Sequence, residues 1–208
     1  MDFNHFIKNT EIIKNKVLGG LDAQFRLAPK MRLKYTDEKI AASNPKKAAV
    51  LALFYPNENN ETCFLLTQRA SYIGTHSAQI SFPGGKIEQK DNSLQATALR
   101  ETFEEVGIEE KHITIIREIT DVFIPPSNFL ATPFIGFSTT KPIIKINHEV
   151  DHTFDVKLSD LLNDENISII NITTSYANKI DVPCFKLNNY IVWGATAMIL
   201  NEIKELLK

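Results

Sequence analysis

The chain has 208 residues and a mass of 23.5 kDa, enough for one substantial hydrophobic core and too little for two ordinary domains with linkers. Lys and Arg (23) nearly balance Asp and Glu (25), which excludes the strongly basic surface typical of nucleic-acid-binding proteins. Apolar runs are far shorter than a membrane span, and no signal-peptide pattern begins the chain. We expect a cytoplasmic protein that binds neither membrane nor nucleic acid, with Cys63 and Cys184 reduced and buried.

The first 45 residues are expected to form a helical extension to the main core. Apolar residues recur at roughly helical spacing across residues 2–18, which predicts one amphipathic helix. Residues 19–45 have a mixed composition and predict an irregular arm. The extension has two open roles, packing against the core or forming a homodimer contact. Because no repeat or Pro/Gly/Ser linker interrupts the chain, residues 1–208 are expected to form a single domain with its core at 46–208.

From residue 46 onward the pattern predicts short strands separated by turns. Residues 48–55 and 63–67 are expected to form a hairpin, because the segment between them is rich in Pro, Asn and Glu. A short strand is expected at 79–82. Further strands are predicted at 113–120, 134–137, 150–156, 167–172 and 183–185, with a helical turn at 158–162.

Two longer helices are predicted within this strand-rich chain. One covers residues 93–106, with Ser93 as its N-cap and Gly107 as a left-handed C-terminal stop. The other covers residues 194–207 and carries its apolar residues on one face. Strands lying between helices, without regular βαβ alternation, indicate an α/β fold in which helices cover both faces of a mixed sheet.

The first of these helices carries the residues that point to chemistry. Glu101, Glu104 and Glu105 are related as i, i+3 and i+4, so their carboxylates share one helical face. Three clustered carboxylates repel one another unless a cation lies among them, and hard oxygen ligands suit Mg²⁺ or Mn²⁺. The alternative is a solvated acidic helix face.

A glycine pair precedes this helix and favours the metal-binding interpretation. Gly84 and Gly85 follow Phe82-Pro83 and allow the backbone to approach an ion or a phosphate closely. A strand, a glycine turn and an acidic helix together predict a cradle for a divalent metal ion and a bridging diphosphate.

At these residues the sequence resembles the Nudix hydrolase family, whose motif reads G-x5-E-x7-R-E-U-x-E-E-x-G-U with U aliphatic. Gly85 matches the first glycine, and Asp91 stands where the family has Glu. One extra residue then precedes the rest of the motif, and Thr102 stands at a position that is usually aliphatic in the family. The remaining matches are Arg100, Glu101, Glu104, Glu105, Gly107 and Ile108.

Within that family the chain is similar to a branch resembling coenzyme A pyrophosphatases, which shares the extra residue and the Asp. The branch has an upstream pattern, L-L-T-x-R-[SA]-x3-R-x3-G-x3-F-P-G-G, matched here by Leu65–Ala70 and Phe82–Gly85. Gly74 replaces its second arginine and Ala78 its first glycine. Segments 122–137 and 191–197 are also similar, so the resemblance covers about residues 46–207.

The resemblance implies an α/β/α sandwich enzyme that hydrolyses a nucleoside diphosphate linkage with Mg²⁺ or Mn²⁺. For coenzyme A, the products would be 3′,5′-ADP and 4′-phosphopantetheine. Glu101 and Glu105 are the expected principal metal ligands, with Glu104 as a further ligand or a water-orienting group and the Gly85 carbonyl completing the shell. Arg100 is expected to brace the glutamates by ion pairing, with substrate contact as the alternative.

Three more side chains are candidates for substrate contact or proton transfer. Arg69 ends a predicted strand and could bind phosphate through its guanidinium, with a surface ion pair as the alternative. His76 lies in the loop that follows and is a candidate substrate contact, alongside a solvated role. Glu149 is a candidate catalytic base, and a surface carboxylate is its alternative.

Two other functions stay open at this stage. The first is Nudix hydrolysis of a different small nucleotide, such as ADP-ribose or a dinucleotide polyphosphate, which the departures at Gly74 and Ala78 favour. The second is a non-catalytic binding module derived from the same fold. The presence of all three motif glutamates argues against the second.

Overall fold

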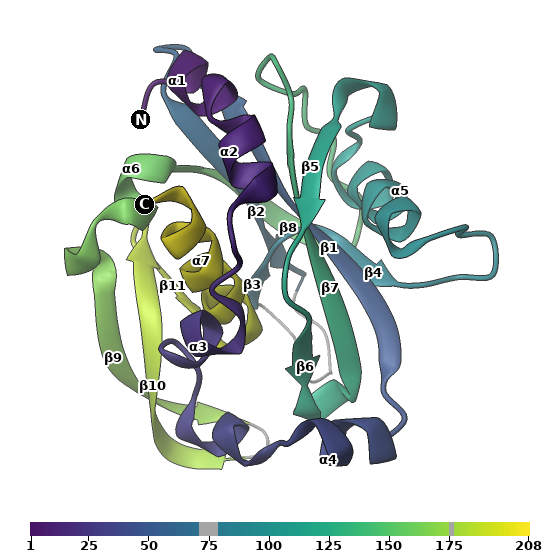
Figure 1. The fold of residues 1–208 in the computed structure, drawn as a ribbon, viewed down its shortest axis with the longest axis vertical. Helices are drawn as coiled ribbons and strands as arrows, with labels where there is room; N and C mark the ends of the chain where they lie inside the picture. Colours follow the sequence, from purple (N-terminus) through teal and green to yellow (C-terminus); the bar gives the residue numbers. More distant parts are fainter. Residues whose placement is uncertain (71–78, 175–176) are drawn as a thin grey trace.

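The computed structural model describes residues 1–70, 79–174 and 177–208 (Figure 1). Its larger sheet has the strand order β3-β2-β1-β7-β5, with β4 also paired to β1, β6 to β7 and β8 to β2. Helices lie on both faces of this sheet, which confirms the predicted mixed α/β sandwich. The strands are β1 (Lys46–Pro56), β2 (Thr62–Arg69), β3 (Ile80–Ser81), β4 (Gly84–Lys86), β5 (Thr114–Glu118), β6 (Val122–Ile124), β7 (Phe129–Phe137) and β8 (Val150–Lys157).

The central strand β1 shows why the larger sheet is covered on both faces. Ala49, Leu51 and Leu53 contribute to the core beneath helix α5 (Leu94–Val106), whereas Ala52 and Phe54 contribute to the core on the opposite face. Because successive side chains point to opposite faces, a strand buried on both needs a continuous apolar run. The unbroken run in the sequence therefore reflects its central place in the sheet.

A smaller sheet and the C-terminal helix complete the second core. The smaller sheet has the order β11-β10-β9, with β9 at Ile167–Thr174, β10 at Ala177–Leu187 and β11 at Tyr190–Trp193. Helix α7 (Gly194–Leu207) lies between the two sheets (Figure 1). Its buried side chains explain the apolar face predicted for it. The short helix α6 (Leu158–Leu162) has the predicted bounds.

The N-terminal segment differs from the single helix predicted over residues 2–18. It forms α1 (Phe3–Lys8) and α2 (Thr10–Asn15), separated at Asn9. The Asn9 side-chain amide and its backbone N–H both donate to the His5 carbonyl, so the residue caps α1 locally. The helical spacing predicts that Phe6, Ile12, Ile13 and Val17 share an apolar face. Phe6 and Ile13 are buried, but Ile12 is 62% and Val17 90% exposed, so the prediction is wrong for those two residues.

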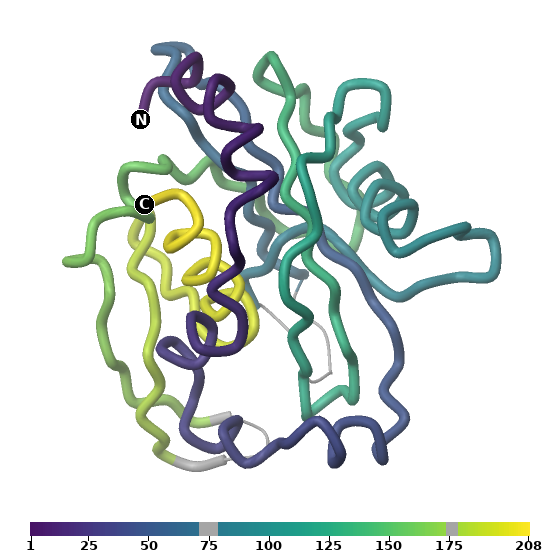
Figure 2. Tube along the Cα trace, viewed as in Figure 1, coloured from purple at the N-terminus to yellow at the C-terminus, as the bar shows by residue number. Residues whose placement is uncertain are grey.

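The arm at residues 19–45 is more ordered than predicted. It contains α3 (Gly20–Phe25), the 3-10 helix η1 (Lys30–Lys34) and α4 (Asp37–Ala42). Figure 2 shows the arm passing close to α7, and α3 packs against that helix. Gln24 donates to the buried carboxylate of Glu202 on α7 (2.8 Å), a long-range contact that local composition does not reveal. The arm thus packs against the core, one of its two expected roles.

Most strand predictions are confirmed, with different ends. The hairpin of β1 and β2 is present, and β7 and β10 are longer than predicted. Strands β4, β6 and β11 were missed because each is only three or four residues long and depends on a neighbouring strand. The remaining short 3-10 helices are η2 (Glu110–His112), η3 (Pro125–Ser127) and η4 (Asp164–Asn166).

Two expectations from the sequence, about the cysteines and about membrane-spanning segments, can be compared with the described residues. Cys63 and Cys184 are both buried and free of disulfide bonds, as predicted. Within the described ranges, no helix has the length and apolar character needed to cross a bilayer.

The ends of α5 have the predicted caps. The Ser93 hydroxyl accepts from the Ala96 amide (3.1 Å), and Gly107 is left-handed with φ +74°.

Replacing Gly107 with Val should lower the free energy of unfolding by about 1–3 kcal/mol, because a β-branched residue resists this conformation. A Cβ at Gly107 would also lie 3.0 Å from the Lys145 Cβ. Thermal unfolding measures the loss, Gly107→Asn is the milder control, and an unchanged Tm for the valine variant would contradict the prediction.

Candidate active site

The glycine pair lies where the edge strand β4 meets both β1 and α5. Gly84 pairs with Val50 and Gly85 with Ala49 in the antiparallel ladder. A Cβ at Gly84 would lie 2.3 Å from the Ala49 carbonyl oxygen, and one at Gly85 would lie 2.5 Å from the Glu101 carboxyl carbon. The sheet therefore requires glycine at residue 84, whereas glycine at residue 85 leaves room for the Glu101 carboxylate.

Glu105 is the most buried of the three motif glutamates. It is 4% exposed, and its Oε2 accepts a hydrogen bond from the Gly84 amide (3.1 Å). Its Oε1 lies 3.8 Å from Nη1 of Arg69. Burial raises the pKa of Glu105 to about 7, although the Gly84 amide and the Arg69 guanidinium favour the charged form. The fold thus keeps a carboxylate in a poorly hydrated position, where a cation would stabilise it.

Arg100 connects the other acidic groups of the segment. Its guanidinium pairs with Asp91 through Nε (2.8 Å) and Nη2 (2.9 Å), and with Glu101 and Glu104 through Nη1 (2.9 Å each). Nη2 also donates to the Lys86 carbonyl on β4 (3.0 Å). This is the geometry that a bracing role requires, since one planar cation fixes the helix, the turn and the strand together.

Glu101 and Glu104 differ in their surroundings. The Glu101 side chain is 16% exposed, and burial raises its pKa despite the adjacent Arg100. The Glu104 side chain is 43% exposed and also pairs with Lys90 (3.3 Å). The three carboxylates therefore share one helical face, as predicted, but only Glu101 and Glu105 are largely shielded from water.

Asp91, noted in the sequence only as a departure from the motif, anchors this network. Its carboxylate accepts from Arg100, the Thr97 hydroxyl (3.0 Å) and the Glu88 amide (2.9 Å). These hydrogen bonds, that of Arg100 foremost, hold the pKa of Asp91 well below its usual range. Asp91 therefore ties the loop after β4 to α5 through Arg100.

Asp91→Asn should therefore lower the free energy of unfolding at neutral pH by about 2 kcal/mol, because the amide loses charge-assisted hydrogen bonds to Arg100. A depressed folded-state pKa gives stability that is complete above the unfolded value, about 3.9, and is lost as the pH falls below it. The difference between variant and wild type should therefore shrink from pH 4 downward. Urea unfolding at pH 7, 4 and 3 measures it, with the exposed Asp151→Asn as control. A deficit that stays constant with pH would contradict the prediction.

Arg69 lies at the end of β2 and binds two carboxylates. Besides Glu105, it pairs with Glu149 through Nη2 (3.4 Å). Its buried Nε has no hydrogen-bond partner within the described part of the chain. Glu149 precedes β8, which pairs with β2 and so brings this residue to the site. The third candidate, His76, lies outside the described residues.

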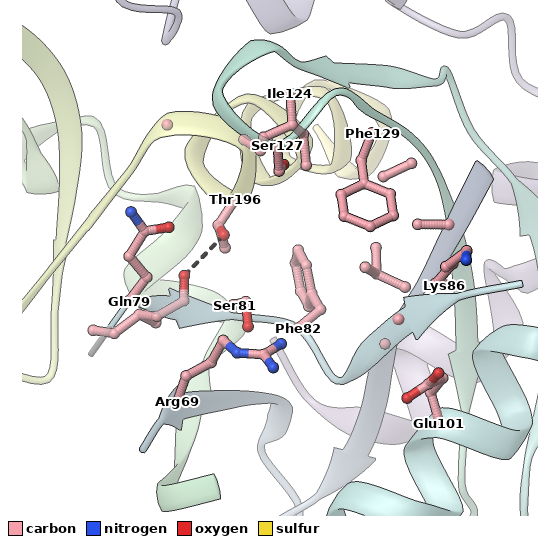
Figure 3. A pocket seen from close by; sticks show the side chains of 18 of the residues that line it. Arg69, Gln79, Ser81, Phe82, Lys86, Glu101, Ile124, Ser127, Phe129 and Thr196 are labelled. Carbon is pink, nitrogen blue, oxygen red and sulfur yellow. Dashed lines mark hydrogen bonds between the residues drawn. The ribbon is translucent and has the colours of Figure 1, made fainter. Parts of the chain in front are cut away.

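These groups line one side of a cavity of about 450 Å³, a volume suited to a nucleotide-sized ligand. In Figure 3, Arg69 and Glu101 lie on one side of the cavity, and Ile124, Ser127 and Phe129 lie on the other. Thr196, at the start of α7, donates to the Ile80 carbonyl (2.9 Å) and closes a further part of the wall. The cavity is thus acidic on one side and largely apolar on the other.

Several lining residues were missed or left open by sequence reasoning. Arg32 comes from the N-terminal arm, and Ser127 from the short turn before β7. Nothing local marks these residues, because distant parts of the chain bring them to the cavity. Trp193, beside the glycine that begins α7, also lines the cavity.

The donor set suits a divalent cation, although no ready-made cluster of three His, Cys, Asp or Glu ligands exists among residues 1–70, 79–174 and 177–208. Glu101 lies beside Gly85 and Glu105 accepts from the Gly84 amide, so both carboxylates meet the glycine pair at the cavity wall. Magnesium is usually held by one or two carboxylates together with substrate phosphates and water, so a complete protein cage is not required. The residues present therefore fit Mg²⁺ or Mn²⁺.

Fold and site together define an α/β domain with an acidic strand–turn–helix cradle beside a ligand-sized cavity. The family model for the NUDIX domain matches residues 45–167, so the chain belongs to the Nudix family. It is 32% identical to Nudix hydrolase 15, mitochondrial, of Arabidopsis thaliana over 164 residues, which cover 75% of this chain but only 56% of that protein.

One further relative and one solved structure extend the comparison. The chain is 28% identical over 198 residues to the uncharacterized Nudix hydrolase NudL of Yersinia pestis (strain Pestoides F), covering 94% of this chain and 98% of that protein. Among solved structures, the NUDIX domain of Shewanella oneidensis NrtR complexed with ADP ribose has a TM-score of 0.52 at 15% identity, covering 85% and 96% of the two chains. This last likeness concerns the fold alone.

Proposed function

We propose that this chain is a metal-dependent hydrolase of nucleoside diphosphate linkages, with coenzyme A or its derivatives as substrate. The observation that carries the proposal is the pair of shielded carboxylates, Glu101 and Glu105, held against the Gly84-Gly85 backbone at a cavity of about 450 Å³. The similarity to the coenzyme A pyrophosphatase branch in residues 65–70 and 82–85 supports the choice of substrate.

In this proposal Glu101, Glu105 and the Gly85 carbonyl hold the metal ion. When bound, the ion neutralises the charge of the diphosphate and lowers the pKa of an attacking water. Arg100 keeps Glu101 in place through its ion pair, and Gly84 orients Glu105 through its amide. These contacts fix the carboxylates before substrate binds, so little reorganisation is needed during the reaction.

Arg69 and Glu149 complete the proposed mechanism on the same side of the cavity. Arg69 is placed to bind a phosphate oxygen with its guanidinium. Glu149 lines the cavity with its side chain 48% exposed, and it is the candidate to accept a proton from the attacking water. Its ion pair with Arg69 restrains its position near the metal ligands.

Incubation of the purified protein with coenzyme A and Mg²⁺, followed by mass spectrometry of the products, tests this function. Formation of 3′,5′-ADP and 4′-phosphopantetheine, abolished by EDTA, is the expected result. ADP-ribose and diadenosine tetraphosphate serve as comparison substrates. Faster hydrolysis of either one would overturn the assignment to coenzyme A, and binding without any turnover would indicate a non-catalytic module.

A further inference from the structure

The cavity has one lining cation that the proposed metal site does not use. Its described lining holds the carboxylates of Glu88, Glu101, Glu104, Glu105 and Glu149. Arg69 and Lys86 are the lining cations on the strands that build this acidic side. A third lining cation, Arg32, comes from the N-terminal arm. We infer that Arg32 is a specificity-determining residue that binds a phosphate monoester on the substrate's ribose, separate from the diphosphate that is cleaved.

The placement of Arg32 supports this role. Its Nη1 donates to the carbonyl of Phe123 on β6 (2.6 Å), which ties the guanidinium to the strand preceding Ile124. Figure 3 shows Ile124 across the cavity from Arg69 and Glu101. Strands β4, β1, β7 and β6 are successive neighbours, so three interstrand steps separate the glycine pair on β4 from this strand. Arg32 therefore approaches a ligand from the side opposite the carboxylates.

The surface between the two charged sides suits a nucleoside. Ala48, Ile124, Phe129 and Ala131 line it, and they offer apolar and aromatic contacts rather than charge. A ligand whose diphosphate lies at the carboxylates would lay its sugar and base across this surface. An additional ribose phosphate would then need its own counter-ion, because the metal site already serves the diphosphate. A guanidinium matches the geometry of phosphate and keeps its charge at any physiological pH.

This inference rests on the proposed function, because coenzyme A is a nucleoside diphosphate derivative that carries a 3′-phosphate. It also gives the N-terminal arm a purpose beyond packing, since the arm delivers a residue to the cavity. Dephospho-coenzyme A differs from coenzyme A only in lacking that phosphate. The two compounds therefore measure the contribution of Arg32 within one reaction.

The test compares kcat/KM for coenzyme A and dephospho-coenzyme A in the wild type, Arg32→Gln and Arg32→Lys. Wild type should prefer coenzyme A, and the Gln variant should lose about tenfold to hundredfold on coenzyme A and far less on dephospho-coenzyme A. The Lys variant should recover part of the preference, because it keeps the charge without the planar fork. Arg26→Gln is the matched control, since Arg26 belongs to the same arm, pairs with Glu205 and does not line the cavity.

A purely structural role for Arg32 gives a different result. If its bond to Phe123 only fastens the arm, the Gln variant should lower Tm and reduce turnover of both compounds equally, which would overturn the inference. Titration calorimetry compares the affinities for the product 3′,5′-ADP and for AMP, and this comparison tests the inference without turnover. Tighter binding of 3′,5′-ADP by the wild type that is lost in Arg32→Gln supports the inference even if coenzyme A is not hydrolysed. Equal binding of the two nucleotides, or no binding, overturns it.

Discussion

Glu105→Gln should reduce metal-dependent turnover by about a thousandfold while leaving the fold intact, because it removes the charge of a proposed metal ligand and no other part of the side chain. The amide oxygen of Gln can still accept the hydrogen bond that the Gly84 amide donates to Glu105. The lost negative charge was itself unfavourable at this buried position, so Tm should change little. Steady-state kinetics over a range of Mg²⁺ concentrations and thermal unfolding provide the two measurements.

Glu104→Gln is the matched control on the same helix. Its carboxylate is 43% exposed and pairs with Arg100 and Lys90, so we expect a much smaller loss of turnover than at Glu105. Near-wild-type turnover and unchanged Mg²⁺ dependence in Glu105→Gln would contradict its assignment as a metal ligand. Equal losses in both variants would instead assign the metal to the whole acidic face.

Gly85→Ala should reduce turnover by about a hundredfold without unfolding the protein, since the added methyl would lie 2.5 Å from the Glu101 carboxyl carbon and push that side chain aside. The end of a glutamate side chain moves at little cost, so the backbone of β4 should remain in place. Turnover and Mg²⁺ affinity should therefore fall together. Kinetics as a function of Mg²⁺ and the circular dichroism spectrum provide the measurements.

The neighbouring glycine offers an instructive comparison. A Cβ at Gly84 would lie 2.3 Å from the backbone oxygen of Ala49, so Gly84→Ala must displace β4 from β1. We expect that variant to lose about 2 kcal/mol or more of stability, whereas Gly85→Ala should lose little. If Gly85→Ala proved as unstable as Gly84→Ala, the close approach to Glu101 would not be the reason for glycine at residue 85.

The sequence predicted the parts of this protein whose structure depends on neighbouring residues. The caps of α5 at Ser93 and Gly107 were located correctly, because capping is a local hydrogen-bonding and backbone property. The shared face of the three motif glutamates followed from helical geometry in the same way. Strand β4 could not be predicted, because its three residues are a strand only through pairing with β1.

At the site, too, the sequence predicted the local features, and the long-range contacts depended on the tertiary structure. By itself, the sequence determined the acidic helix and the shared face of its three glutamates, since these depend on residue type and short spacing. The turn expected at Gly84-Gly85 is instead part of strand β4. Only the tertiary structure decided that Glu105 is buried while Glu104 faces solvent, that Asp91 anchors Arg100, and that Arg32 reaches the cavity from the N-terminal arm. Burial and long-range contacts arise when strands and helices distant in sequence pack together, and no local pattern records which ones will meet.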